Sequence, residues 1–244
     1  MMLLETVQPY LLFEAKRAVR TARRTARVPD DINCSRMAEP LTREFPLFLL
    51  PAVALPGELI PLHVFEERYK TMVGECLEGD RQFGILWLSD DGLRELGCAV
   101  QIERVLERME DGRMNLLVRG TRPFRVIERQ SHLPYPAGVV EFVEDRDEQP
   151  DPGLLERAHK AYAELVKRAT DRAPEDSELR EMSAYAMAAT VDFGLDAKQG
   201  LLDLRSEKAR LRLVTRLFRA AMKRLDFVER AQERARSNGK IRFG

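Results

Sequence analysis

The sequence predicts an α+β fold in which a small β-barrel, with one inserted helix, is followed by a helical subdomain. Residues 44–145 contain about six short apolar runs of strand length, and residues 151–224 carry apolar side chains at helical spacing. The chain has 244 residues, of which 44% are hydrophobic and 33% charged, so a sizeable core is expected. An acidic break at 145–151, DRDEQPD, separates the two patterns.

The β-rich part is expected to open with a short strand, a long connection and the inserted helix. Residues 45–50 form a buried apolar run. Prolines and one glycine punctuate the connection that follows: Pro51, Pro56, Gly57 and Pro61. Over residues 65–77 the apolar side chains recur at helical spacing, which predicts a helix, and Gly79 stands where a C-cap glycine is expected.

Further strands complete the predicted barrel: 82–88, 96–106, 114–118, 124–127 and 137–143. Asp111-Gly112 lies between two of them, and an Asp-Gly pair between two strand patterns is a strong hairpin signal. Because the strands are short and follow one another closely, closure into a barrel is the simplest way to remove unpaired edges.

The helical part is expected to begin at Asp151-Pro152, an N-cap aspartate followed by a proline at the first helical position. Further helices are predicted over 179–189 and 196–204, and Ser206 is the expected N-cap of the last helix. The apolar residues of that helix step by three and four: Leu211, Val214, Phe218, Ala221, Leu225 and Val228. We expect Phe218 to lie in the core of this part.

Both ends of the chain are basic. In a leader spanning residues 1–43, six positive charges stand between positions 15 and 29 without an acid. Three interpretations of this leader stay open: a surface helix that touches anionic lipid or nucleic acid, a weakly packed or disordered segment, or residues upstream of a true start at Met37. Residues 225–244 are interpreted as a basic helical tail, and from 219 to 244 eight Lys and Arg face three acids.

Charge and cysteine content exclude several classes of protein. The 40 basic and 40 acidic residues give a net charge of zero, which excludes a basic field over the whole protein but not local patches. The three cysteines form no CxxC pair, so neither a disulfide framework nor a zinc site is expected. No stretch approaches the ~18–20 apolar residues of a membrane span, and the first residues do not resemble a signal peptide. We therefore expect a cytoplasmic protein.

Catalytic motifs are missing from the sequence. It contains no GxxxxGK[ST] phosphate loop, no GxSxG and no GxGxxG. The histidines, His63, His132 and His159, fall in separate segments, and His63 with Glu66 lacks the second histidine of HExxH. We therefore predict no enzymatic activity, no cofactor, and no catalytic or metal-binding residues.

Several motifs together carry a resemblance to a known family. Residues 45–85 contain F-P-L, P-G, P-L-H-V-F-E-x-R-Y and F-G-I in that order, which resembles the opening of the amino-terminal, substrate-binding domain of Lon protease. Further matches are D-G-R at 111–113, G-T-R-P-F-R at 120–125 and K-Q-G-L-L-D at 198–203. The resemblance covers about residues 44–222 and implies a PUA-like β-barrel (44–145) and a helical part (151–224). Because no ATPase or protease module follows, the chain resembles a stand-alone member of the family.

The resemblance implies a non-catalytic module that binds unfolded or hydrophobic segments of client proteins, or that acts as an adaptor to a protease or chaperone. Recognition is expected to use exposed apolar side chains on the barrel or in a groove facing the helices. The alternative is a PUA-like module that binds RNA or a small ligand, and the basic leader and tail motivate it. An unrecognised hydrolase ranks last.

The motif residues are expected to serve mainly as scaffold. Prolines restrict φ in the connection, and Gly57 allows a turn that other residues disfavour. Arg68, near the start of the predicted helix, is expected to reach a carboxylate. The full set is Phe45, Pro46, Pro56, Gly57, Pro61, His63, Phe65, Glu66, Arg68, Tyr69, Gly84, Asp111, Gly112, Gly120, Phe124, Gln199, Leu201 and Leu202.

Overall fold

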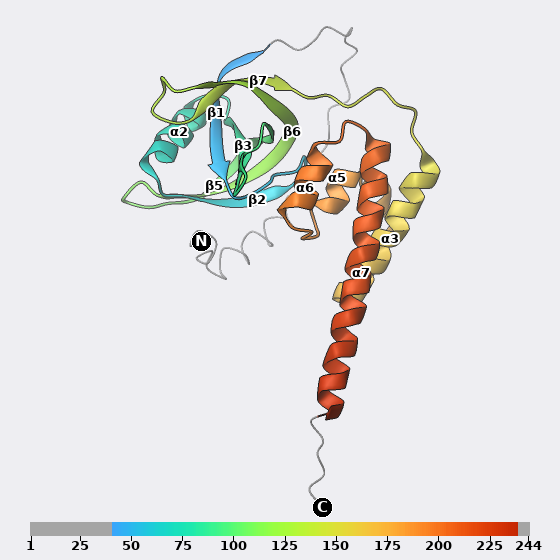
Figure 1. Cartoon of the computed structure of the whole chain (residues 1–244). Coiled ribbons are helices and arrows are strands. Elements are labelled where there is room, and N and C mark those ends of the chain that lie inside the picture. The colour runs from blue at the N-terminus through green and yellow to red at the C-terminus, as the bar shows by residue number, and fades with distance from the viewer. Residues whose placement is uncertain (1–40, 239–244) are drawn as a thin grey trace, which may run out of the picture. The chain divides into compact units, whose positions relative to one another are not determined.

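The computed structural model describes residues 41–238, so most of the predicted leader and the last residues of the basic tail lie outside the described part. The chain divides into two compact units, Met1–Glu144 and Asp145–Gly244. The division falls at the start of the acidic segment DRDEQPD. Figure 1 shows the strands together with one helix in the first unit and only helices in the second.

The first unit is a closed sheet with one helix. Its elements are β1 (Thr42–Leu50), β2 (Leu59–Val64), α2 (Glu67–Glu78), β3 (Gln82–Ser89), β4 (Gly92–Leu93), β5 (Leu96–Arg108), β6 (Met114–Gln130) and β7 (Ala137–Phe142). The strand order is β1-β7-β6-β5-β3-β4, and a parallel pairing of β1 with β3 closes the ring. β2 pairs with β6 outside this path. The predicted α+β fold, a closed sheet before a helical part, is confirmed.

The sequence-based strand assignment was wrong at two places. Residues 59–64, taken as part of a connection, form β2 and pair with β6. Among the described strands β2 has no partner on its other side, and an edge strand tolerates Pro61 because a missing N–H is harmless there. The separate strands predicted over 114–118 and 124–127 are one strand, β6, which pairs first with β2 and then with β7.

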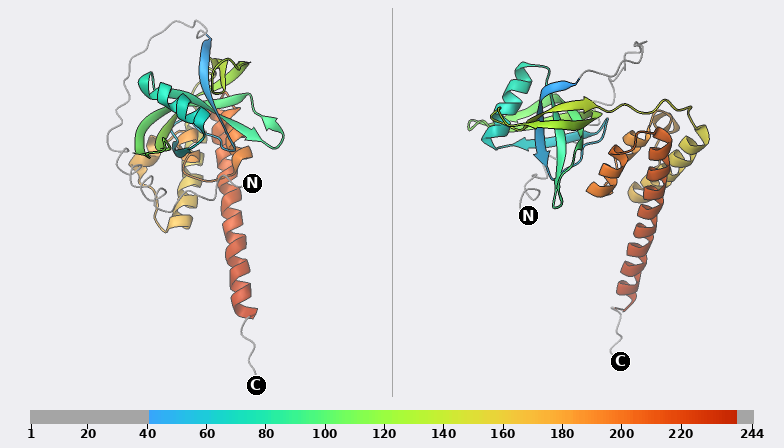
Figure 2. Two further views of the ribbon diagram at one scale, coloured as in Figure 1. Left: turned by 90° about the vertical axis from the view of Figure 1, so that its left-hand side faces the viewer. Right: turned by 45° about the horizontal axis from the view of Figure 1, so that its top comes forward.

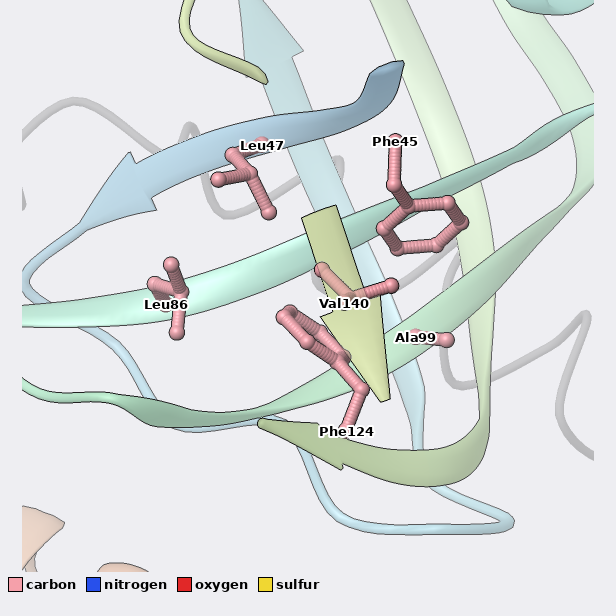
Figure 3. Packing of buried hydrophobic residues seen from close by; sticks show 6 residues of the cluster. All are labelled: Phe45, Leu47, Leu86, Ala99, Phe124 and Val140. Carbon is pink, nitrogen blue, oxygen red and sulfur yellow. The ribbon is translucent and has the colours of Figure 1, made fainter. Parts of the chain in front are cut away.

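The core of the first unit lies inside the closed sheet. Figure 3 shows six buried side chains from five strands converging there: Phe45, Leu47, Leu86, Ala99, Phe124 and Val140. The rings of Phe45 and Phe124 meet edge to face with their centroids 5.5 Å apart, a favoured aromatic geometry. α2 adds a second contact, since the buried ring of Tyr69 lies 4.0 Å from that of Phe48 on β1.

The second unit is helical. Its elements are α3 (Pro152–Thr170), α4 (Asp176–Arg180), α5 (Ala184–Ala188), α6 (Leu195–Leu202) and α7 (Glu207–Asn238). Both predicted N-caps are present: Asp151 Oδ1 accepts from the Leu154 N–H at 3.0 Å, and Ser206 Oγ accepts from the Ala209 N–H at 3.2 Å. The single helix predicted over 179–189 is instead divided, because Ser183 caps a new helix start by accepting from the Ala186 N–H.

Phe218 lies in the core of the second unit, as predicted. It is fully buried, and its ring centroid is 5.5 Å from both Tyr162 of α3 and Phe193. The predicted row of apolar residues on the last helix does not stay buried beyond Phe218 for long, since Val228 is 43% exposed. Figure 2 shows the reason, because α7 extends past the end of α3. α7 also crosses residues 224–225 without a break, so the expected tail starts inside this helix.

A buried arginine fixes the first turn of α7 to the acidic segment. Arg210 is 3% exposed, and its guanidinium donates to both carboxylate oxygens of Asp145 and to the Leu204 carbonyl. Its Nε donates to Glu207, and its plane lies 4.3 Å from the Tyr185 ring centroid. Burial alone would lower the pKa of Arg210, but the hydrogen bonds to Asp145 and the neighbouring negative charges raise it overall.

Candidate functional site

Three of the residues singled out from the sequence form the centre of the closed sheet. Phe45 and Phe124 are buried against each other, and Gly84 lies beneath their rings. A Cβ added at residue 84 would meet Phe45 at 3.0 Å and Phe124 more closely still. The three positions therefore depend on one another for packing.

A second group holds the connection before β2 against β6. The Gly57 N–H donates to the Gly120 carbonyl at 2.8 Å, and the Gly120 N–H donates to the Glu58 carbonyl at 2.8 Å. Gly57 has a φ of +81°, which glycine adopts readily. A Cβ at Gly120 would lie 2.1 Å from the Leu55 carbonyl oxygen, so this close approach also requires glycine. Pro56 lies in the same turn.

The remaining barrel positions lie on strands and at a hairpin. Pro46 is opposite Ala137 on β7, while Pro61 is opposite Leu117 on β6. Gly112 has a φ of +80° in the predicted hairpin turn. Beside it, donation from the Arg113 backbone N–H is the main cause that lowers the pKa of Asp111. Lys70 Nζ of α2 donates to the Asp111 carbonyl at 2.9 Å and so ties the hairpin to the helix.

The three predicted residues of the second unit are buried in α6. Leu201 and Leu202 are almost completely buried, and Gln199 is nearly so. The Gln199 amide donates to Asp203 at 2.9 Å, which closes the end of the short helix. These side chains contribute packing within the unit rather than an exposed chemical group.

The motif residues at the start of α2 differ from the buried ones described above, because several of them are exposed to solvent. Tyr69 is buried, but Arg68 lies over its ring at 4.5 Å from the centroid. Arg68 Nη2 pairs with Glu66 Oε2 at 2.8 Å, so the predicted contact with a carboxylate is present. Both side chains of this pair are partly exposed, Arg68 by 48% and Glu66 by 37%. The pair therefore orients surface groups rather than adding much to stability.

A chain of hydrogen bonds crosses three strands beside this entrance. His63 Nδ1 on β2 lies 2.7 Å from Asn115 Oδ1 on β6, and Asn115 Nδ2 donates to Glu107 Oε2 on β5 at 2.8 Å. Because an amide oxygen only accepts, Nδ1 of His63 is the donor in this contact. Sequence analysis missed Asn115 and Glu107. A single polar residue inside the apolar run MNLLV was the available signal for Asn115.

Phe65 completes this surface. Its ring is 43% exposed and stacks on His63 with centroids 5.8 Å apart and planes inclined by 24°. The histidine is fixed in turn by Asn115, which is buried. An exposed aromatic ring is therefore held at a defined place by a rigid support. We call His63, Phe65, Asn115 and Glu107 the helix-entrance surface.

Metal ligands, thiols and membrane spans were also sought among the described residues. Over 41–238 no group of three or more His, Cys, Asp and Glu side chains is placed to hold a metal ion. Burial raises the pKa of the Cys76 thiol to about 12 and also raises the pKa of Cys98, so both stay protonated at neutral pH. No helix in this part of the chain has the length and apolarity needed to cross a membrane.

The architecture defines a two-unit α+β module, a closed sheet followed by helices. Residues 44–220 match the family model described as the ATP-dependent protease La (LON) substrate-binding domain. The chain belongs to this family, as the sequence motifs had indicated.

Known relatives agree with this assignment. The chain is 26% identical over 182 residues to a Lon protease of Anaeromyxobacter dehalogenans, and 26% identical over 183 residues to Lon protease 2 of Myxococcus xanthus. Each match covers 68% of this chain but 22% of the relative. The chain therefore spans about a fifth of the length of these curated relatives.

Solved structures show the same fold. A Lon N-terminal domain protein from Xanthomonas campestris is 28% identical, with a TM-score of 0.54 over 69% of this chain and 94% of the other. The N-terminal domain of a Mycobacterium avium complex Lon protease has a TM-score of 0.58 at 20% identity, over 71% of this chain and 97% of that one. The second likeness concerns the fold alone.

Proposed function

We propose that this chain is a non-catalytic module that recognises unfolded or hydrophobic segments of client proteins. The observation that carries the proposal is the family match over residues 44–220, because the matched family is a substrate-binding domain. Delivery of clients to a separate protease or chaperone would suit such a module. The buried free thiols Cys76 and Cys98 are consistent with a reducing, cytoplasmic location.

The helix-entrance surface is the part of the first unit that we assign to client binding. Phe65 offers an exposed apolar ring, and aromatic anchors contribute strongly to binding when their position is fixed beforehand. His63, Asn115 and Glu107 supply that fixation through the hydrogen bonds described above. We propose a scaffold role for the other motif residues, since most of them are buried or engaged in turns.

Client binding can be tested with a permanently unfolded protein, such as reduced and carboxymethylated α-lactalbumin carrying a fluorophore. We expect Phe65→Ser to weaken its binding about tenfold, the effect of an anchor residue worth about 1.4 kcal/mol. The matched control is Ile127→Ser. Ile127 is 52% exposed and lies in the later part of β6, which pairs with β7, away from Asn115. Its affinity should stay within twofold of the unchanged chain. Equal loss in both variants, or in neither, would contradict the assignment of this surface.

The absence of catalysis is tested separately. The purified chain should neither hydrolyse ATP nor degrade casein in its presence, because its sequence has no phosphate loop and no recognisable nucleophile–base motif. ATP-dependent casein degradation that co-purifies with the chain through two independent affinity tags would overturn the non-catalytic part of the proposal, while leaving client binding open to its own test.

A further inference from the structure

Strand β2 leaves one edge of the sheet open. It pairs with β6 alone among the strands of the described chain. In an antiparallel pair, the N–H and C=O groups of successive residues point alternately toward and away from the partner strand. The Gly120 N–H donates to the Glu58 carbonyl, so the even-numbered residues of β2 face β6 and the odd-numbered ones face away. The outward backbone groups belong to Leu59, Pro61 and His63, and we call them the open edge of β2.

The open edge of β2 has backbone groups available for hydrogen bonding. The N–H groups of Leu59 and His63, and the carbonyls of all three residues, have no hydrogen-bond partner within the part of the chain that the structure describes. Pro61 contributes a carbonyl but no N–H. A strand lying along this edge would therefore meet three acceptors and two donors over about 13 Å.

The side chains of the same three residues lie on one face of β2, because side chains alternate between the two faces of a strand. Leu59 and Pro61 are half-buried, whereas His63 is exposed and stacks on Phe65. Val64, which points to the other face, is completely buried. The open edge therefore runs beside a row of apolar and aromatic side chains that ends at Phe65, the anchor assigned above.

The occupant of this edge must supply extended backbone. A helical segment does not, because its N–H and C=O groups bond to one another. A second copy of this chain fits poorly: if two open edges pair with Leu59 opposite His63, Pro61 meets Pro61 and the central pair lacks both N–H groups. An unfolded segment of another protein can supply both the backbone groups and side chains at alternate positions.

We infer that an unfolded client segment binds by adding an antiparallel strand to the open edge of β2, with apolar side chains beside those of Leu59, Pro61 and His63. This inference rests on the proposed function and specifies how a client reaches the helix-entrance surface. The antiparallel direction is inferred because antiparallel pairing is the more stable per residue.

This mode of binding predicts which client segments are preferred. Residues that pair across an antiparallel ladder share one face of the sheet. The client residues whose backbone bonds to the open edge are therefore the same ones whose side chains lie beside it. Clients should be selected for apolar residues at every second position rather than for total apolar content.

The first experiment uses a nine-residue peptide with three valines alternating with four threonines between terminal lysines. The peptide should displace labelled, carboxymethylated α-lactalbumin from the full chain. Methylation of the three valine backbone nitrogens removes the donors to the open edge. It should raise the inhibition constant at least about tenfold, since one hydrogen bond contributes a factor of about two to ten. Methylation of three threonine nitrogens, whose N–H groups point away from β2, is the matched control and should change the constant less than about threefold.

The second experiment changes the protein. Pro61→Ala supplies the missing donor of the open edge, so affinity for the peptide should rise by a factor of about two to ten, the contribution of one hydrogen bond. Pro134→Ala is the matched control, because Pro134 is an exposed proline in the connection between β6 and β7, and its affinity should stay unchanged. Both variants are compared at concentrations at which they sediment as the unchanged chain does, so that pairing of two copies does not contribute.

Several outcomes would overturn the inference. No displacement by the peptide, while α-lactalbumin itself binds, would contradict strand addition and leave the Phe65 test of client binding unaffected. A larger loss on threonine methylation than on valine methylation would contradict the antiparallel direction. Equal effects of the two methylations would remove the open edge as the site, as would no gain from Pro61→Ala when circular dichroism shows the variant to be folded. Failure of α-lactalbumin to bind at all would overturn the proposed function and this inference with it.

Discussion

Gly84 lies so close to Phe124 that a Cβ added to it would stand 2.4 Å from the Cζ atom of the ring. At residue 84, strand β3 therefore contacts the aromatic ring directly through its backbone. This contact explains why the central residue of the F-G-I motif is a glycine. The backbone conformation at residue 84 does not require glycine, but the space beside the Phe124 ring does.

We expect Gly84→Ala to lower the free energy of unfolding by about 1–3 kcal/mol, the typical cost of overpacking a core. Gly74→Ala is the matched control, because Gly74 lies inside α2 with nothing within 4 Å of its added Cβ. That change should stabilise the chain by about 0.5–1 kcal/mol through helix propensity. Urea denaturation measures both changes, and shifts of the same sign would contradict the packing argument.

Phe218→Ala should destabilise the second unit by about 3–5 kcal/mol, because it removes a fully buried ring that contacts two other aromatic rings. Arg219→Ala, one residue further along the same helix and exposed, should change the midpoint of unfolding little. Circular dichroism at 222 nm follows the helices of this unit during denaturation. An unchanged midpoint for Phe218→Ala would mean that the ring is not part of the core.

Arg210→Lys keeps the charge but should lower the free energy of unfolding by about 1.5–3 kcal/mol. An ammonium group cannot bind both oxygens of Asp145 and also lie flat against the Tyr185 ring. Arg113→Lys is the comparison, because its pair with Asp111 is about half exposed on both sides and the change should alter stability little. Equal losses in chemical denaturation would show that burial of Arg210 has no special consequence.

Thiol reactivity checks the two buried cysteines. In a Cys34→Ser background at pH 8, neither Cys76 nor Cys98 should react with Ellman's reagent while the chain is folded. The pKa of Cys76 is raised to about 12 and that of Cys98 is also raised, so thiolate at pH 8 is of order 0.01% or less. In guanidinium both should react within minutes, since unfolded thiols ionise near pH 8.5. Rapid reaction in the native state would contradict their burial.

Features that depend on neighbouring residues could be predicted from the sequence. The cap at Asp151 and the hairpin at Asp111-Gly112 each depend on a few consecutive residues, and both are present. The three- and four-residue spacing of apolar residues in the last helix is also a local pattern, and it predicted the burial of Phe218. It did not predict where burial ends, because the length of α3 decides that.

Features that depend on distant partners could not be predicted in the same way. Pro61 argued against a strand, and only the position of β2 at an edge makes the proline acceptable. The hydrogen bonds from His63 through Asn115 to Glu107 require three strands in one register, which no local pattern encodes. The sequence motifs therefore led to the buried scaffold residues, but not to Asn115 and Glu107 of the helix-entrance surface.

The place of β1 in the ring has a consequence for synthesis of the chain. β1 lies between β3 and β7, so the sheet cannot close before residues 137–142 have left the ribosome. At about 5–20 residues per second, the interval between completion of β1 and completion of β7 is about 5–20 s. Throughout that time the nascent chain carries open strand edges, which are templates for aggregation. These edges are covered only when β7 has paired with both β1 and β6.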